Sequence, residues 1–328
     1  MRRCQIDPIK YILAITLIAC TFAMNGIAAA QSKPEVALIG QWDLTVKGAS
    51  GSYPSWLEIR KSGTSTLVGG YVGQFGSVRP ISKIEVVESG FRFTVPPQWE
   101  RRKTDVEVTG RLDGEILRGE VTDDKGAKVT WEGKRAPALD DSTYPIWGEP
   151  INLFNGHDLS GWKPRDASKS NGWKVKEIGV TGRYLVNAIP GNDLVTEAKF
   201  KDFQLIAEFR YPKGSNSGLY LRGRYEVQIE DNFGDAPESH KIGGVYGFLT
   251  PSFNAAKPAD EWQKMELTLI GRRVTVVLND RRILDQQLIP GITGGALDSN
   301  EGEPGPVMIQ GDHGPVEFRK LVLSPAKE

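Results

Sequence analysis

Apolar and polar side chains alternate through most of the segment from Gln204 to Asp231. Because successive side chains of a strand point to opposite faces of a sheet, this pattern predicts three short strands joined by two turns. One face of these strands would be apolar and would pack against a core. The other face would carry a single polar patch, made of Glu208, Arg210, Tyr220, Arg222, Glu226 and Gln228.

The composition of this patch indicates more than contact with solvent. The outer face of an antiparallel sheet is commonly solvated, but this face carries almost no Lys, Thr or Ser. Arginines, carboxylates, a glutamine and a tyrosine hold sugars and anions through bidentate hydrogen bonds and stacking. We therefore interpret the patch as a binding face. The alternative is a ladder of cross-strand ion pairs.

The rest of the chain also consists of short alternating runs between turns. Its 328 residues include 37 Gly and 20 Pro, which favours an all-β fold with many turns. With 41 basic and 41 acidic residues the formal net charge is zero. The chain has no basic stripe, so its charge gives no sign of nucleic acid as a partner.

The N-terminal residues 1–30 resemble a secretory signal peptide. Basic residues precede an apolar run from Tyr11 to Phe22, and Ala28–Ala30 fits a small-residue cleavage site. Leu17–Cys20 offers an alternative, a lipobox in which Cys20 would be acylated and anchor the protein. The apolar run is too short to favour a transmembrane helix. Both alternatives predict an exported protein, either periplasmic or secreted.

Cysteine and histidine are scarce. Cys4 and Cys20 both lie in the signal segment, so the exported protein would contain no disulfide and no thiol nucleophile. The three histidines are too few for most zinc sites. No cofactor is predicted. A divalent metal held by Asp231, Glu230 or nearby oxygens stays open, although no loop shows convincing ligand spacing.

Two domains are predicted after the signal peptide. Residues 35–136 contain eight alternating runs, which favour a small antiparallel barrel of the lipocalin type, with a β-sandwich as the alternative. Its core would include Trp42, Trp56 and Trp131. Residues 137–150 form a proline-rich linker. Residues 151–328 are long enough for a two-sheet jelly roll.

The loop Pro96–Arg102 of the first domain places Trp99 beside two arginines. Such a loop could contact a sugar, although an exposed structural loop is the favoured interpretation. In the second domain, Tyr246 and Trp262 could also stack on a sugar, with core packing as the favoured role of Trp262.

The second domain resembles the 3-keto-disaccharide hydrolase family. The resemblance begins at Leu153–Trp162 (LFNGHDLSGW) and continues in family order over the whole domain. Its further motifs are Asn216–Gly223, Tyr225–Ile229, Gly244–Gly247, Pro258–Trp262, Leu278–Asn279, Ile309–Gly314 and Val316–Arg319. Two departures are Gln263, where the family often has Asn, and Asp280, where it often has Gly. The first domain is not covered.

This resemblance implies a concanavalin-like jelly roll with its site on the concave face of a sheet. It also implies a disaccharide or glycoside substrate whose C3 hydroxyl has been oxidised to a ketone by a partner oxidoreductase. A C3 ketone acidifies the proton on C2, so the C1–O bond can break by elimination, after which water adds. This route needs a base, a donor for the enolate oxygen and an acid for the leaving alcohol.

The sequence offers candidates for each role. His313, Glu226 and Glu208 are the catalytic candidates, since histidine exchanges protons near neutral pH and carboxylates act as acids or bases. The substrate-binding candidates are Arg210, Asn216, Tyr220, Arg222, Gln228, Tyr246 and Gln310. Direct hydrolysis by Glu208 and Glu226 is a second mechanism. The alternative function is a non-catalytic carbohydrate-binding protein, because jelly rolls serve both uses.

Overall fold

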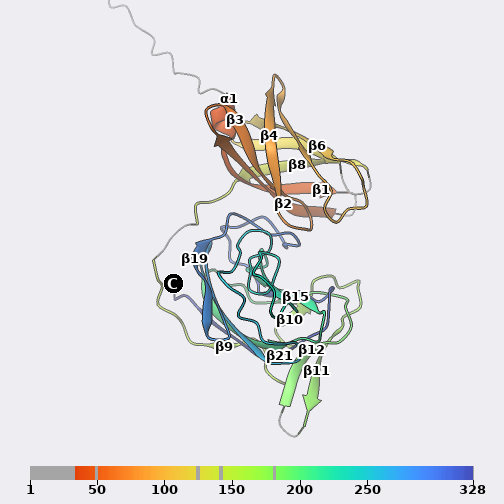
Figure 1. Cartoon of the computed structure of the whole chain (residues 1–328), viewed down its shortest axis with the longest axis vertical. Coiled ribbons are helices and arrows are strands. Elements are labelled where there is room, and N and C mark those ends of the chain that lie inside the picture. The colour runs from red at the N-terminus through yellow and green to blue at the C-terminus, as the bar shows by residue number, and fades with distance from the viewer. Residues whose placement is uncertain (1–33, 49–50, 123–125, 140–142, 180–181, 328) are drawn as a thin grey trace, which may run out of the picture.

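The computed structural model describes residues 34–48, 51–122, 126–139, 143–179 and 182–327, and Figure 1 shows its two β bodies. The single described helix, α1 (Pro34–Leu38), has five residues, so within these residues no helix is long and apolar enough to cross a membrane. The proposed signal peptide lies outside the described residues. The fold is all-β, as predicted.

The first body is a closed barrel of eight antiparallel strands, which confirms the barrel and rules out the sandwich. Each strand pairs with its neighbour in sequence, and β8 closes on β1. Trp42 and Trp131 fill the interior together with other aromatic rings. The strands are β1 (Gly40–Gly48), β2 (Gly51–Ser62), β3 (Thr66–Val72), β4 (Arg79–Val87), β5 (Gly90–Val95), β6 (Val106–Asp113), β7 (Ile116–Thr122) and β8 (Lys128–Arg135).

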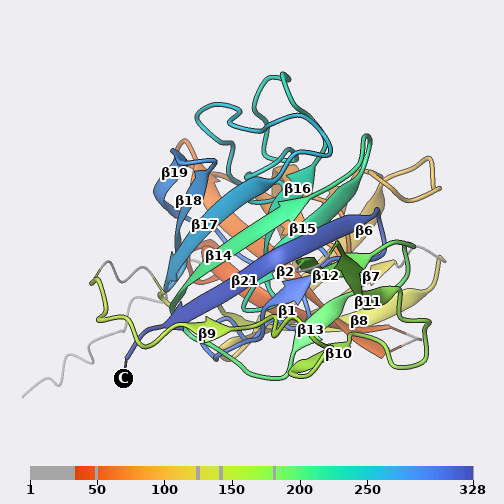
Figure 2. The ribbon, with the colours of Figure 1, turned by 90° about the horizontal axis from the view of Figure 1, so that it is seen from below.

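The second body contains two sheets packed face to face, as predicted. The five-stranded sheet has the order β10 (Trp162–Pro164), β13 (Leu194–Thr196), β20 (Met308–Ile309), β15 (Asn216–Leu221) and β16 (Tyr225–Glu230). The larger sheet has the order β11 (Trp173–Ile178), β12 (Gly182–Asn187), β21 (Val316–Pro325), β14 (Phe203–Arg210), β17 (Gln263–Ile270), β18 (Arg273–Leu278) and β19 (Arg281–Leu288), and β9 (Ile151–Asn152) pairs with β21. The five-stranded sheet lies between the larger sheet and the barrel (Figures 1 and 2).

The alternating segment that predicted three adjacent strands is split between these sheets. Its strands form where predicted, but β14 belongs to the larger sheet and β15 and β16 to the smaller one. The apolar faces of all three strands point into the shared core. Their polar faces therefore point away from each other, on opposite sides of the sandwich. The prediction of one continuous polar patch was wrong.

The barrel packs against the second body through the outer face of β1–β3. Trp56 and Val72 belong to the same buried cluster as the sandwich core, which corrects the prediction that Trp56 lies in the barrel. The Trp56 ring meets Phe248 edge to face, with centroids 5.5 Å apart. A Cβ at Gly291 would overlap the Trp56 indole, so glycine is needed for this close approach.

A buried group of charges lies at the same interface. Asp43 of β1 faces Glu301, which is fully buried and accepts a hydrogen bond from the Tyr225 hydroxyl at 2.8 Å. Arg272 lies 3.7 Å from Glu301 and bonds to Gln41 of the barrel at 3.0 Å. Burial, and next the negative charge of Glu301, raise the pKa of Asp43 to about 9, against the smaller opposing effects of Arg272 and Arg224.

This raised pKa makes stability depend on pH. Between pH 3.8 and about 9 the folded chain keeps a proton on Asp43 that the unfolded chain has lost. The free energy of unfolding therefore falls as pH rises through this window, by up to ~1.4 kcal/mol per pH unit from this group. We expect Asp43→Asn to make the fall shallower, as measured by urea unfolding at several pH values.

The control for this prediction is Asp105→Asn, an exposed carboxylate just before β6 of the barrel. That substitution should leave the slope of stability against pH unchanged. A slope in Asp43→Asn equal to that of the wild type would contradict the assignment of a buried proton to Asp43.

Candidate active site

The outer face of the five-stranded sheet carries two rows of side chains across its strands. In the first row Met308, Tyr220 and Glu226 are cross-strand neighbours. In the second row Gly218 pairs with Gln228, and Gln310 donates its backbone N–H to the Gly218 carbonyl at 2.9 Å. A Cβ at Gly218 would overlap the Glu226 carboxyl group, so the glycine leaves room for that group.

Glu226 is the central ionisable group of this face. Its side chain is 3% exposed, and burial raises its pKa to about 8. Tyr220 and His313 lower this pKa, while the charges of Asp193 and Asp312 raise it further. The carboxyl group is therefore mostly protonated at neutral pH. A protonated carboxylic acid can donate a hydrogen bond, which a carboxylate cannot.

Tyr220 is paired with Glu226. The Tyr220 hydroxyl lies 2.9 Å from Glu226 Oε2 and 2.9 Å from the Gly294 carbonyl oxygen. A hydroxyl has one hydrogen, so Tyr220 donates to only one of these two acceptors at a time. When Tyr220 donates to Glu226 Oε2, the proton of the neutral carboxyl group lies on Oε1 and is left for a ligand oxygen. Burial, and next Glu226, raise the pKa of Tyr220 well above its usual value, so the hydroxyl keeps its proton and can support Glu226 as a neutral donor.

A more exposed pair lies close to these buried groups. His313 Nδ1 is 2.5 Å from Asp312 Oδ1, and the side chains are 54% and 49% exposed. The hydrogen bond with Asp312 is the main cause of a raised pKa for His313, and Glu226 and Asp193 add to it. His313 is thus oriented by Asp312 and accessible to a substrate.

Asp193 and Arg165 support this region. Asp193 Oδ1 accepts the backbone N–H of Gly311 at 3.0 Å, and its Oδ2 is paired with Arg165 at 3.0 Å. Arg165 also donates to the Ala296 carbonyl. The two residues therefore connect the Gly311–Gly314 turn, which carries His313, to the loop that contains Gly294.

Two amides of this face have hydrogen-bonding capacity left for a ligand. Within the part of the chain that the structure describes, Gln228 Oε1 and Gln310 Oε1 are buried without a protein partner. The other end of the Gln228 amide donates to the His240 carbonyl at 3.1 Å. Sugar hydroxyls are donors that would satisfy both oxygens.

Tyr246 and Asn216 lie at the margins of this face. Tyr246 donates its backbone N–H to the Glu226 carbonyl at 3.0 Å, and its ring meets His240 edge to face. Asn216 pairs with Glu230 at the far end of β15 and β16. The structure therefore gathers six predicted residues around one face, with Asn216 at its end: His313, Glu226, Tyr220, Gln228, Gln310 and Tyr246.

Three predicted residues lie elsewhere. Glu208 and Arg210 project from the outer face of the larger sheet, where they pair with Arg319 at 2.6 Å and Glu317 at 2.7 Å. Arg222 is fully buried near the barrel and donates to the Gly271 carbonyl. Because Glu208 and Glu226 lie on opposite faces of the sandwich, direct hydrolysis by this pair of carboxylates is wrong.

Trp262 also differs from its predicted role. The ring is half-buried on the outer face of the larger sheet, with the guanidinium groups of Arg210 and Arg319 at 4.9 and 4.4 Å from its centroid. The prediction of core packing was wrong, because β17 begins only at Gln263 and the preceding residue remains on the surface.

Sequence reasoning missed Asp193, Arg165 and the Gly294 carbonyl. Asp193 directly precedes a buried strand, and a charged residue in that position is a weak signal of a role at the strand end. The Gly294–Gly295 pair is a clearer signal, since a Cβ at Gly295 would lie 2.5 Å from the Tyr220 hydroxyl oxygen. Nothing in the sequence pattern around Arg165 indicates that it lies at the site.

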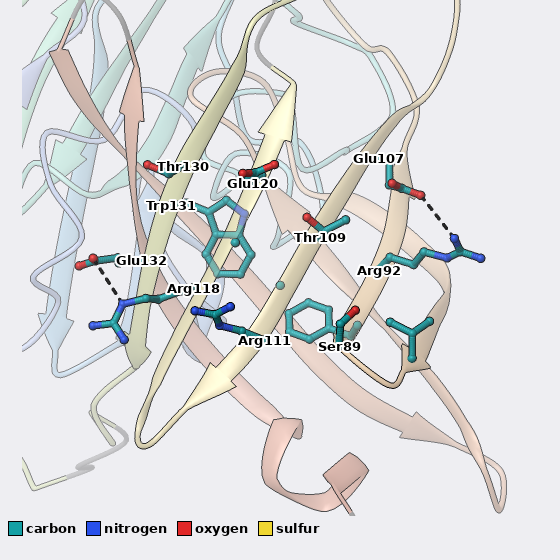
Figure 3. Close-up of a pocket in the computed structure, with 14 residues that line it drawn as sticks. Ser89, Arg92, Glu107, Thr109, Arg111, Arg118, Glu120, Thr130, Trp131 and Glu132 are labelled. Atoms are coloured by element: carbon teal, nitrogen blue, oxygen red, sulfur yellow. Dashed lines mark ion pairs between the residues drawn. The ribbon is translucent and has the colours of Figure 1, made fainter.

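A groove lies away from this site, on the barrel. It is open, has a volume of about 780 Å³ and is lined by residues from the β4–β5 turn and from β5 to β8. Figure 3 shows charged side chains around it, including the ion pairs Arg92–Glu107 and Arg118–Glu132. Its lining contains no histidine, and two of its arginines are paired with its glutamates, so the groove lacks the oriented histidine of the sheet face.

No metal centre is formed by the described residues. Among them, no group of three or more His, Cys, Asp or Glu side chains converges as metal ligands. Glu230 and Asp231, the predicted candidates, lie at the end of β16, and Asp231 accepts the backbone N–H of Gly214 at 2.8 Å.

Comparison with known proteins identifies the family to which the second body belongs. Residues 149–324, more than half of the chain, match the family described as the 3-keto-alpha-glucoside-1,2-lyase-like domain. The chain belongs to this family. The match contains β9 to β20 and most of β21, and with them every residue of the candidate site.

A curated relative is the 3-keto-disaccharide hydrolase of Bacteroides thetaiotaomicron, 24% identical over 189 residues. The alignment covers 47% of this chain and 64% of the relative. Two solved structures of candidate glycosyl hydrolases from Parabacteroides distasonis are also similar. The first is 24% identical, with a TM-score of 0.41, and the match covers 56% of this chain and 92% of that structure. The second is 21% identical, with a TM-score of 0.43, and the match covers 54% of this chain and 94% of that structure.

Proposed function

We propose that this protein cleaves the glycosidic bond of 3-keto-glycosides by removing the C2 proton, eliminating the C1 substituent and adding water. The observation that carries the proposal is the buried Tyr220–Glu226 pair beside the Asp312–His313 pair. Membership of the family and the name of the curated relative support the same substrate class.

Glu226 would donate its proton to the ketone oxygen at C3, while the Tyr220 hydroxyl donates to the other carboxyl oxygen and holds the acid in place. When the C2 proton leaves, negative charge develops on the ketone oxygen, and preorganised donors in a buried site stabilise that charge. A carboxylic acid kept neutral by its apolar surroundings is a known hydrogen-bond donor to an enolate oxygen. Gln228 and Gln310 would hold the sugar hydroxyls.

His313 would act as the base. Its neutral imidazole takes the proton from C2, the C1–O bond breaks, and the resulting imidazolium returns the proton to the leaving oxygen. Water then adds its oxygen to C1, and C2 regains a proton, so the net reaction is hydrolysis. Asp312 would orient the ring and stabilise its positive charge, as a carboxylate does for histidine in other acid–base pairs.

The test is incubation with trehalose and with 3-keto-trehalose in D₂O, followed by mass spectrometry and proton NMR. Release of 3-keto-glucose from the oxidised sugar only, with deuterium at C2, is the expected result. Cleavage of plain trehalose would indicate an ordinary glycosidase. Binding without cleavage would replace the enzyme by a carbohydrate-binding protein, the second function predicted from the sequence.

The two pKa shifts predict the pH dependence of kcat/KM. Activity should rise as His313 loses its proton, at a pH above its usual 6.5, and fall above about 8 as Glu226 ionises. Glu226→Gln keeps a neutral donor that does not titrate, so the fall above pH 8 should disappear. Retention of that fall in the variant would contradict the role of Glu226.

We also propose that the chain is exported and acts after an oxidoreductase. The signal segment supports export to the periplasm or outside the cell, and fractionation followed by N-terminal sequencing of the mature protein tests it. A 3-keto sugar has to be made by oxidation of the C3 hydroxyl, so an oxidoreductase acting on glycosides would supply the substrate.

A further inference from the structure

The barrel contributes a loop to the edge of the candidate active site. Residues 73–78 connect β3 and β4, and the Gln74 carbonyl accepts the backbone N–H of Gly295 at 2.8 Å. A Cβ at Gly294 would overlap the Gly76 carbonyl oxygen, and a Cβ at Gly247 would lie 2.5 Å from the Ser77 Cβ. The barrel loop therefore touches two loops of the second body.

Both of those loops hold Glu226. Thr293 accepts the backbone N–H of Glu226 at 3.0 Å, while Tyr246 donates to the Glu226 carbonyl at 3.0 Å. Gly294 also binds the Tyr220 hydroxyl. The barrel loop therefore contacts the two segments that hold Tyr220 and Glu226 in place.

An exposed aromatic pair joins this barrel loop to the loop between β5 and β6. Phe75 and Trp99 are 42% and 45% exposed, with ring centroids 5.7 Å apart and planes at 78°. The Trp99 indole N–H donates to the Phe75 carbonyl at 3.1 Å, and a Cβ at Gly76 would lie 2.8 Å from Trp99 Cδ1. Contacts therefore run from Trp99 through Gly76 and Gly294 to Tyr220.

The loop that carries Trp99 is held rigidly. Glu100 is paired with Arg79 at 2.6 Å, both side chains are less than 10% exposed, and Glu100 accepts the backbone N–H groups of Gln98 and Trp99. Gln98 bonds twice to Ser77. An aromatic surface that stays exposed although its loop is fixed is preorganised to bind a flat apolar partner.

We propose that Phe75 and Trp99 form a binding subsite for the leaving half of the substrate, a second sugar ring that stacks on the exposed aromatic surface. This inference rests on the proposed function, because it assumes that the keto sugar occupies the face with Tyr220 and Glu226. The barrel would then select substrates by their leaving group, while the second body performs the chemistry.

The test compares two substrates that differ only in the leaving group, 3-keto-trehalose and methyl 3-keto-α-glucoside. Trp99→Ala should lower the ratio of kcat/KM for the disaccharide to kcat/KM for the methyl glycoside about five- to tenfold, as expected for one stacking contact. Trp99→Phe keeps a ring and should retain most of the ratio. Tyr144→Ala, which removes an aromatic ring that is 58% exposed elsewhere, is the matched control and should leave the ratio unchanged.

An unchanged ratio in Trp99→Ala would overturn the subsite, including the case in which both substrates lose activity equally because Gly294 has moved. If the wild type cleaves neither keto sugar, the proposed function fails and the subsite is tested by calorimetric titration with trehalose. Weaker binding by Trp99→Ala than by Tyr144→Ala would then support the subsite, and equal binding would overturn it.

Discussion

Replacing His313 by glutamine should lower kcat for 3-keto-trehalose cleavage by about 10²- to 10⁴-fold, the usual contribution of a general base. The side chain is 54% exposed and its neighbour Asp312 is half-exposed, so the substitution should leave stability nearly unchanged. Glutamine cannot take a proton from C2. The variant should therefore also lose incorporation of deuterium at C2, which NMR in D₂O measures independently of product release.

The matched control is His157→Gln. His157 lies in the loop before β10 and contacts Arg183 of the larger sheet, away from Tyr220 and Glu226. Its replacement should change kcat by less than about twofold. A His313→Gln variant that still exchanges the C2 proton at the wild-type rate would show that another group is the base.

Replacing Trp56 by alanine should lower the free energy of unfolding by about 3–5 kcal/mol. The ring is 1% exposed and fills the space between the barrel, Phe248 and Gly291, so its removal leaves a cavity that rigid backbone on both sides cannot close. Because Gly291 begins the loop that holds Tyr220 and Glu226, kcat should fall as well. Urea unfolding followed by circular dichroism measures the first effect.

Ile189→Ala is the control for this loss. Because Ile189 is 71% exposed, its replacement should lower the free energy of unfolding by less than about 0.5 kcal/mol. If Trp56→Ala costs no more than Ile189→Ala, the contact between the two bodies contributes little to folding, contrary to the packing described above.

The sequence predicted individual strands better than their assembly. All eight runs of the first domain form barrel strands, because alternation with a period of two is a local property of the chain. The same periodicity placed Tyr220, Glu226 and Gln228 on one face. These predictions needed no knowledge of distant residues.

The errors concern choices that alternation cannot decide. The pattern predicts which side chains of β14 and β16 face a core. It does not reveal that the chain crosses from the larger sheet to the smaller one after β14. Glu208 and Glu226 therefore looked like neighbours. Asp193 and Arg165 were missed for a related reason, since their partners lie far away in sequence and only tertiary folding brings them to the site.

The buried cluster that contains Trp56, Val72 and the apolar faces of both sheets has a consequence for evolution and engineering. Two units joined by a proline-rich stretch look like interchangeable modules that recombination could separate. A shared interior removes that freedom, because a different partner would have to supply an indole of the same shape opposite Gly291. The two halves are therefore expected to be inherited together, with substitutions on one side compensated on the other.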